Sequence, residues 1–210
     1  MADAPHHIIQ TLIIERDELK AHCLRMRELL DKIGFPPGHF YSPLVDDRNV
    51  HAIDVLLIDP ALDDLTLSLG TLSSNVRLLS CPVQEVPLEF FERLEGNDIL
   101  FIDSSHVAKT RSDVNHYLFK IFPLLRPRVI VHIHDILYPF EDLPDWVLTE
   151  HRNWNEACVI RAFLQSNARF QILYWNNYSF HHLKDKLREA MPLCLESEGG
   201  SLWLQVQANA

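Results

Sequence analysis

Residues 97–106 read Asn97-Asp98-Ile99-Leu100-Phe101-Ile102-Asp103-Ser104-Ser105-His106, a short apolar run that ends abruptly in aspartate, serine and histidine. The same pattern returns at Val129-Ile130-Val131-His132-Ile133-His134-Asp135. Ligands of open α/β sheets bind beyond the carboxyl ends of the strands. Two buried strands that each deliver Asp and His at that end therefore predict one chemical site at a shared rim of the sheet.

Strand patterns and helix patterns alternate along the rest of the chain. This alternation predicts an α/β fold with crossover connections around a mainly parallel sheet. The Gly199-Gly200 turn before the last apolar run predicts that the C-terminal strand is antiparallel. The expected strands are 50–58, 75–79, 99–102, 128–133, 170–174 and 201–206, and the expected helices are 63–69, 87–94, 112–125, 155–165 and 182–190.

The chain divides into three predicted parts. Residues 1–34 form an N-terminal helical segment, because apolar side chains recur among charged ones up to a helix-ending Gly34. It either packs on the core or pairs with a second copy, which would make a homo-oligomer. Residues 35–49 form an aromatic, proline-stiffened loop in which His39 and Tyr41 are expected to bind substrate. Residues 50–210 form the α/β domain.

Composition limits the partners. The 210-residue chain has a formal net charge of -10 and no clustered basic surface, which excludes nucleic acid and anionic membranes as expected partners and leaves a small-molecule substrate. No apolar run is long enough to span a bilayer. The start lacks the pattern of a signal peptide, and the four cysteines form no C-x-x-C. We therefore expect reduced thiols and a cytoplasmic location.

The position of polar residues at strand ends assigns roles. Asp59 ends an early strand, where an acid accepts hydrogen bonds from ribose hydroxyls. Asp103 can hold an ammonium group or a metal, and His106 can act as a general base toward a substrate hydroxyl. The alternative is a turn in which Asp and Ser satisfy local backbone groups.

The second strand adds candidates for a cation site. His132 and His134 leave the strand on one face, and we interpret His132 as a core histidine. Asp103, His134 and Asp135 resemble a hard-cation site of oxygen ligands plus an imidazole, which His106 would complete. The long aromatic loop that follows, from Tyr138 to Trp154, is either a lid that contacts substrate through these two rings or a structural cover.

Several motifs resemble a bacterial branch of the class I S-adenosylmethionine-dependent methyltransferases. The resemblance covers most of residues 35–206 and implies a Rossmann-like, seven-stranded sheet. The motifs that carry it are Phe35-Pro36-Pro37-Gly38-His39-Phe40-Tyr41-Ser42-Pro43, Pro82-Val83-Gln84-Glu85-Val86-Pro87, Asp98-Ile99-Leu100-Phe101-Ile102-Asp103-Ser104-Ser105-His106, Val131-His132-Ile133-His134-Asp135-Ile136 and Gly200-Ser201-Leu202-Trp203-Leu204.

The resemblance also implies a cofactor, S-adenosylmethionine, and its binding residues. Asp59 matches the ribose-binding acid, Gln84 falls where adenine is contacted, and Asp103 matches the residue that faces the methionine part, with Ser104 beside it. In related metal-dependent O-methyltransferases, the positions of Asp103, His134 and Asp135 lie near a divalent cation, although a histidine departs from the usual acid or amide there.

One part of the family pattern is missing. Such enzymes carry a first strand and a glycine-rich loop before the strand that ends in the ribose-binding acid. Here the glycines are at 34, 38, 70, 96, 199 and 200, and none lies between Pro43 and Asp59. The chain resembles a family member with an internal deletion of the first strand, its loop and the next helix. We therefore expect the strand ending at Asp59 to pair with the strand ending at Asp103, because a gap would leave buried backbone groups unpaired at a cost of about 1–3 kcal/mol each. We also expect cofactor affinity to be weak or lost.

Three functions follow from these observations. The first is methyl transfer to an oxygen or nitrogen of a small metabolite or sugar, with His106 as the base, His134 as the alternative base and Asp103 as a further catalytic residue. The second is a catalytically inactive methyltransferase-like module for binding or oligomerisation. The third is a metal-dependent enzyme that uses the Asp/His cluster.

Overall fold

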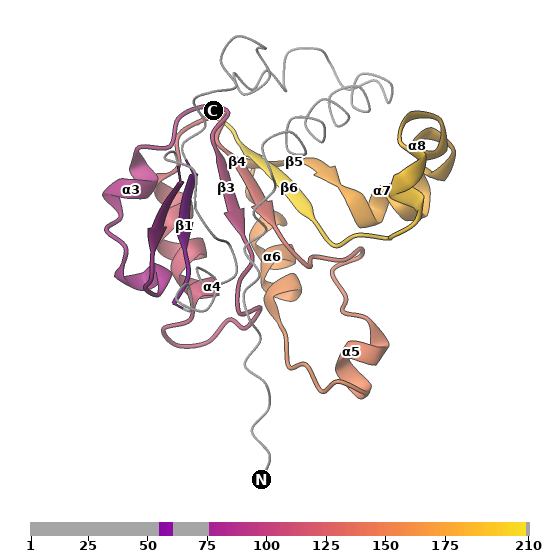
Figure 1. Ribbon diagram of the computed structural model, residues 1–210, viewed down its shortest axis with the longest axis horizontal. Coiled ribbons are helices and arrows are strands. Elements are labelled where there is room, and N and C mark those ends of the chain that lie inside the picture. The colour runs from indigo at the N-terminus through magenta and orange to yellow at the C-terminus, as the bar shows by residue number, and fades with distance from the viewer. Residues whose placement is uncertain (1–54, 61–75, 209–210) are drawn as a thin grey trace.

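The computed structural model describes residues 55–60 and 76–208 (Figure 1). The predicted N-terminal helix, the loop at 35–49 with His39 and Tyr41, and the helix at 63–69 lie outside the described residues. Within that part of the chain, no helix is both long and apolar enough to cross a membrane.

The described elements follow the predicted alternation. The helix expected at 112–125 is one continuous helical run of three pieces. The helix expected at 182–190 is observed at Lys184–Ala190, directly after a further helix that ends at His182. The strands are β1 (Val55–Ile58), β2 (Val76–Leu79), β3 (Ile99–Ile102), β4 (Ile130–Ile133), β5 (Phe170–Trp175) and β6 (Leu202–Val206). The helices are η3 (Val83–Glu85), α3 (Glu89–Glu92), α4 (Asp113–His116), η4 (Tyr117–Ile121), η5 (Phe122–Leu124), α5 (Pro144–Leu148), α6 (Glu156–Leu164), α7 (Asn176–His182), α8 (Lys184–Ala190) and η6 (Pro192–Leu195).

The strands form a four-stranded sheet and a separate two-stranded one. The larger sheet has the order β3-β4-β6-β5. Strands β3 and β4 are parallel, and β6 is antiparallel to both of its neighbours. Strands β1 and β2 form a parallel pair. The α/β class, the parallel pairing and the antiparallel C-terminal strand are therefore confirmed.

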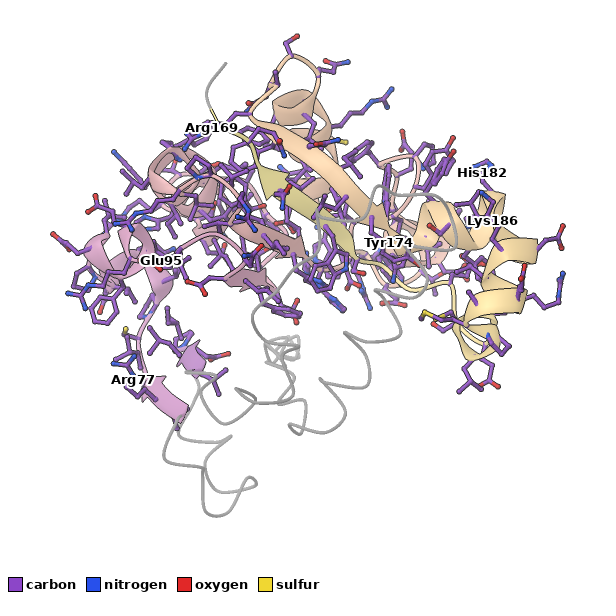
Figure 2. All side chains as sticks on the ribbon, turned by 90° about the horizontal axis from the view of Figure 1, so that it is seen from above. Arg77, Glu95, Arg169, Tyr174, His182 and Lys186 are labelled. Atoms are coloured by element: carbon purple, nitrogen blue, oxygen red, sulfur yellow. The ribbon has the colours of Figure 1, made fainter. Side chains whose placement is uncertain are left out.

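The predicted pairing of β1 with β3 is wrong. β1 pairs with β2 instead, and the backbone N–H of Asp59 extends this ladder to the carbonyl of Leu79 at 3.2 Å. Ile58 and Leu79 pack against the main core, so the pair buries apolar surface without joining the larger sheet. The prediction assumed that unpaired backbone groups of β3 would be buried and therefore costly. The residues of β3 are instead half-buried or exposed. In Figure 2, Arg77 on β2 and Lys186 on α8 lie at opposite sides of the molecule.

One face of the larger sheet carries the main core. Because side chains alternate along a strand, Val131 and Ile133 join that core while His132, between them, faces the other way. The helical run from α4 to η5 and helix α6 supply the opposing side chains. The largest fully buried members include Phe122, Ile121, Leu125, Ile133, Ile160, Leu202 and Leu204.

Two phenylalanines of one helical run provide a matched test of this core. Phe122 is 1% exposed and contacts the rings of Tyr117 and Phe170 at centroid distances of 5.0 and 5.2 Å, whereas Phe119 is 64% exposed. We expect Phe122→Ala to lower the free energy of unfolding by about 3–5 kcal/mol, because it opens a cavity. Phe119→Ala should stay within about 0.5 kcal/mol of the parent. Urea denaturation measures both, and equal effects would contradict the described packing.

Candidate active site

The turn after β3 folds back onto the start of α6. His106 has a φ of 57°, in the left-handed region, and its backbone N–H donates to Ser104 Oγ at 2.9 Å. Its carbonyl accepts from the backbone N–H groups of Asn155 and Glu156 at 3.0 and 3.2 Å. This backbone geometry turns the imidazole inward, where only 7% of the residue is exposed.

A buried carboxylate, Glu156, organises the site. The residue is 1% exposed and lies in the first turn of α6. Its Oε2 lies 2.7 Å from His106 Nδ1 and accepts from Ser104 Oγ at 2.8 Å, and its Oε1 accepts from the hydroxyl of Tyr117. Three donors thus satisfy a group whose burial without partners would be costly.

Tyr117 reaches this carboxylate from a distorted part of its helix. It opens the π-helical segment η4, and such segments are frequent at functional sites because they re-aim side chains. Burial raises the pKa of Tyr117 well above its usual value, and the charge and hydrogen bond of Glu156 raise it further. The phenol therefore stays protonated and acts as a donor.

The hydrogen bond to Glu156 fixes the tautomer of His106. An ionised carboxylate only accepts, so Nδ1 of His106 carries a hydrogen. In the neutral ring, Nε2 is then free to take a proton, and it lies 3.6 Å from Asp103 Oδ1. A histidine oriented by a carboxylate in this way has the geometry of a general base.

Burial and the neighbouring charges shift the pKa values of His106 and Asp103. Burial lowers the pKa of His106, but the hydrogen bond and charge of Glu156, with Asp135 and Asp103, outweigh burial and raise it above its usual value. Burial also raises the pKa of Asp103, as do Asp135 and Glu156, while His134 and His106 lower it. The imidazole of His106 and the carboxyl group of Asp103 therefore influence each other's pKa.

The second predicted cluster lies beside this one but does not form a metal site. His132 and His134 share a face, as predicted, with His132 Nε2 and His134 Nδ1 3.4 Å apart. His132 is buried and stacks on the ring of Phe101 at 4.1 Å, as expected of a core histidine. His134 Nε2 lies 3.5 Å from Asp135 Oδ1, with 42% of its side chain exposed.

The predicted cation site therefore needs correction. Among residues 55–60 and 76–208, no three His, Cys, Asp or Glu side chains are grouped as metal ligands, so Asp103, His134 and Asp135 do not converge on one point. One reason is the direction of each group. Asp103 faces His106 from the end of β3, while the ring of His134 stacks against that of His132 at a centroid distance of 5.6 Å.

The predicted cofactor residues have different surroundings. Asp59 is buried at the end of β1. The amide of Gln84 is exposed and donates to the carbonyl of Arg111 at 3.0 Å. The hydroxyl of Ser104 is directed inward, because it donates to Glu156 and accepts from the His106 backbone. Asp103 is the one of these four that faces the His106 imidazole at the rim.

The two aromatic residues predicted to bind substrate lie in different groups. Trp154 lies against the His106 ring, with centroids 4.0 Å apart and an interplanar angle of 35°. Tyr138 belongs instead to an aromatic cluster with Trp175, Tyr178 and His182, at centroid distances of 5.4, 5.1 and 4.9 Å. Figure 2 labels His182 beyond Tyr174, on the side of α7 and α8. The structure thus joins Trp154, but not Tyr138, to the base.

Comparison with known proteins identifies the domain. Residues 38–136 match the sequence profile of a family described as a methyltransferase domain. This part of the chain is therefore similar to a methyltransferase domain. The match includes Asp59, Asp103, His106 and His134, and it agrees with the α/β fold and with the class I resemblance of the sequence. S-adenosylmethionine is the usual cofactor of such domains.

Other comparisons are more distant. Among curated proteins, none is significantly similar to this chain. One solved structure, a crystal structure of a protein from Corynebacterium glutamicum, is 17% identical with a TM-score of 0.39. The aligned region covers 74% of this chain, and the chain spans 61% of the length of that protein.

The four predicted cofactor residues do not come together within the described residues. Asp59 and Asp103 end strands of two separate sheets. Ser104 is committed to Glu156, and Gln84 to a backbone carbonyl. The glycine-rich loop of the family, whose backbone approaches the cofactor closely, has no counterpart between Pro43 and Asp59. The acid–base group at His106 is therefore better formed than the cofactor site.

Sequence reasoning missed Glu156 and Tyr117. An acidic residue in the first turn of a predicted helix is the ordinary complement of the helix dipole, so nothing marked this one as buried. Tyr117 followed the apolar pattern of its helix. Only the return of α6 to the turn after β3, 50 residues apart in sequence, brings Glu156 to His106.

Replacing the buried carboxylate tests this network. The pKa of His106 is raised in the folded chain. The interaction of His106 with Glu156 therefore stabilises the folded state fully below about pH 6.5, and this stabilisation is lost as pH rises through the raised pKa. We expect Glu156→Gln to lower the free energy of unfolding by about 1–3 kcal/mol in acidic buffer and by less in alkaline buffer. Urea denaturation at a series of pH values measures this, with the exposed Glu189→Gln as control. A deficit that grows with pH would contradict the assignment.

Proposed function

We propose that this chain transfers a methyl group to an oxygen or nitrogen of a small metabolite or sugar, with His106 as the general base. The observation that carries the proposal is the pair of His106 and Glu156, in which the carboxylate fixes Nδ1 at 2.7 Å and leaves Nε2 toward Asp103 at the rim. The methyltransferase-domain match supplies the reaction class.

The residues of the site divide the proton chemistry between them. His106 Nε2 takes the proton of the acceptor hydroxyl or amine, which makes the acceptor a better nucleophile. Glu156 then stabilises the imidazolium, to which it is already hydrogen-bonded. Asp103, 3.6 Å from Nε2, is placed to accept a hydrogen bond from the methyl-accepting substrate or from the charged imidazole ring.

His134 is the less favoured base. Its side chain is far more exposed than that of His106, and its nearest acid, Asp135, is 3.5 Å away and also partly exposed. Its Nδ1 faces another imidazole, that of His132, rather than a buried carboxylate. No group comparable to Glu156 orients it within the described residues.

A specific observation favours a second function, that of a methyltransferase-like binding module without activity. It is the missing glycine-rich loop together with the separation of β1 from the sheet that holds Asp103. Such a module would keep the buried network for stability alone. The two functions differ in whether the chain binds the cofactor and moves a methyl group.

Calorimetric titration with S-adenosylhomocysteine separates these functions. We expect weak, saturable binding, and no heat at millimolar ligand would overturn the proposal for this chain. His106→Gln should bind the ligand as the parent does and lose about 10²–10⁴-fold in methyl transfer, because it removes the base. Release of S-adenosylhomocysteine with a panel of phenols, sugars and amines measures the transfer. The exposed His181→Gln is the matched control, and equal rates for the parent and His106→Gln would reject His106 as the base.

A further inference from the structure

The segment between β4 and α6 is fastened at both ends, and its second end lies next to the site. At its start, the backbone N–H of Tyr138 donates to Asn177 Oδ1 at 2.9 Å. At its end, the side-chain amide of Asn155 accepts from the N–H of Ala108 at 2.7 Å and donates to the carbonyl of the same residue at 3.3 Å. Ala108 lies two residues after His106, so the segment returns to the turn that carries the proposed base.

Between these ends, the side chains of Trp146, Arg152 and Trp154 form a cluster that ends on His106. The guanidinium carbon of Arg152 lies 4.5 Å from the ring centroid of Trp146 and 4.5 Å from that of Trp154. Trp154 in turn lies 4.0 Å from the imidazole of His106. The two indoles also contact each other edge to face, with centroids 5.2 Å apart and an interplanar angle of 68°. Arg152 therefore lies against both rings at the corner that they form, and this cluster connects α5 to the site.

Two hydrogen bonds hold Arg152 against the indoles. Its backbone N–H donates to the carbonyl of Trp146 at 2.9 Å, and its Nε donates to Glu150 Oε2 at 2.6 Å. The second bond is charge-assisted and orients the guanidinium plane. Arginine suits this place because its weakly hydrated guanidinium makes cation–π contacts with both indoles, whereas the ammonium of lysine is a compact, strongly hydrated charge.

We propose that Arg152 is a positioning residue that packs against Trp146 and Trp154 together, where the two indoles meet edge to face, and thereby helps to hold Trp154 against the face of His106. Trp154 then covers one face of the base, and the edge with Nε2 stays directed toward Asp103. The significance for catalysis rests on the proposed function, since it assumes that His106 accepts a proton. The stacking itself does not depend on any activity.

Covering the ring has a physical effect on the base. Burial is the largest influence on the pKa of His106, and it opposes the acidic groups that act on the ring. Glu156 faces it from α6, Asp103 from the end of β3 and Asp135 from the end of β4, and Asp142 of the same segment is also coupled to it. The indole limits how far these charges favour the imidazolium, because it keeps water from the ring.

The direct test is the ring-current shift of the His106 Cε1–H resonance in full-length protein, since an indole 4.0 Å away displaces that signal. We expect Arg152→Gln to move the resonance toward its position in an unstacked histidine. Arg152→Lys should move it in the same direction, because the charge is retained but the contacts of the guanidinium with both indoles are lost. The matched control is Arg188→Gln, which removes an exposed arginine that pairs with Asp185 on α8.

A chemical modification rate provides a second test, for variants in which many resonances shift and the His106 signal is hard to follow. We expect the rate at which diethyl pyrocarbonate modifies His106, followed by peptide mass spectrometry, to rise several-fold in Arg152→Gln, while the rate at exposed His181 stays constant. Adding Trp154→Phe to Arg152→Gln should then produce much less than the product of the two single effects. An unmoved resonance, an unchanged modification rate, multiplicative effects or full rescue by Arg152→Lys would each overturn the proposal.

These readouts also separate this inference from the proposed function. Neither needs cofactor or acceptor. If S-adenosylhomocysteine does not bind, the proposed methyl transfer fails while the resonance and the modification rate still decide the role of Arg152. If Arg152→Gln leaves both unchanged in a chain that transfers methyl groups, only the positioning role fails.

Discussion

The buried carboxylate of Glu156 is the interaction on which the described structure depends. An ionised carboxylate away from water must be satisfied by protein donors, because its burial otherwise costs several kcal/mol. The donors come from two other places in the chain: the turn after β3 supplies His106 and Ser104, and η4 supplies Tyr117. The carboxylate of Glu156 thus fixes the turn after β3 and the segment η4 relative to α6. The turn cannot rearrange without leaving a charge unpaired, which explains why His106 is held in a left-handed conformation.

The parts of the fold set by local pattern were predictable from sequence. The strand at Ile99–Ile102 and the helical run after Ser112 were predicted nearly to the residue, because short apolar runs and a capping serine determine them locally. The rim at which Asp103 and His106 meet followed from the polar ends of parallel strands. Features that depend on long-range packing were not predictable. The pairing of β1 was wrong, because the sequence gives no measure of how exposed the edge of β3 is.

The same distinction applies within the site. A residue's type and its place on a strand end indicated His106, but Glu156, which orients its ring, lies 50 positions away and carries no local mark. Arg152 is a similar case, since an arginine in a long polar loop is usually solvated. It matters here because Trp146 and Trp154, which meet edge to face, both pack against its guanidinium. Sequence therefore indicates where chemistry occurs more readily than it indicates which side chains orient the reacting group.

The protonation state of His106 that favours folding differs from the one that the proposed reaction needs. Glu156 favours the imidazolium of His106, so the network contributes most to folding at the acidic side of neutrality, where that ring is charged. A general base must be neutral to accept a proton, so the proposed chemistry needs the opposite protonation state. Trp154 reduces this conflict, because burial of the ring is the influence that lowers its pKa. An indole held against the base and a carboxylate bound behind it thus act in opposite directions on one proton. Their balance, rather than either group alone, sets the pH above which His106 becomes available as a base.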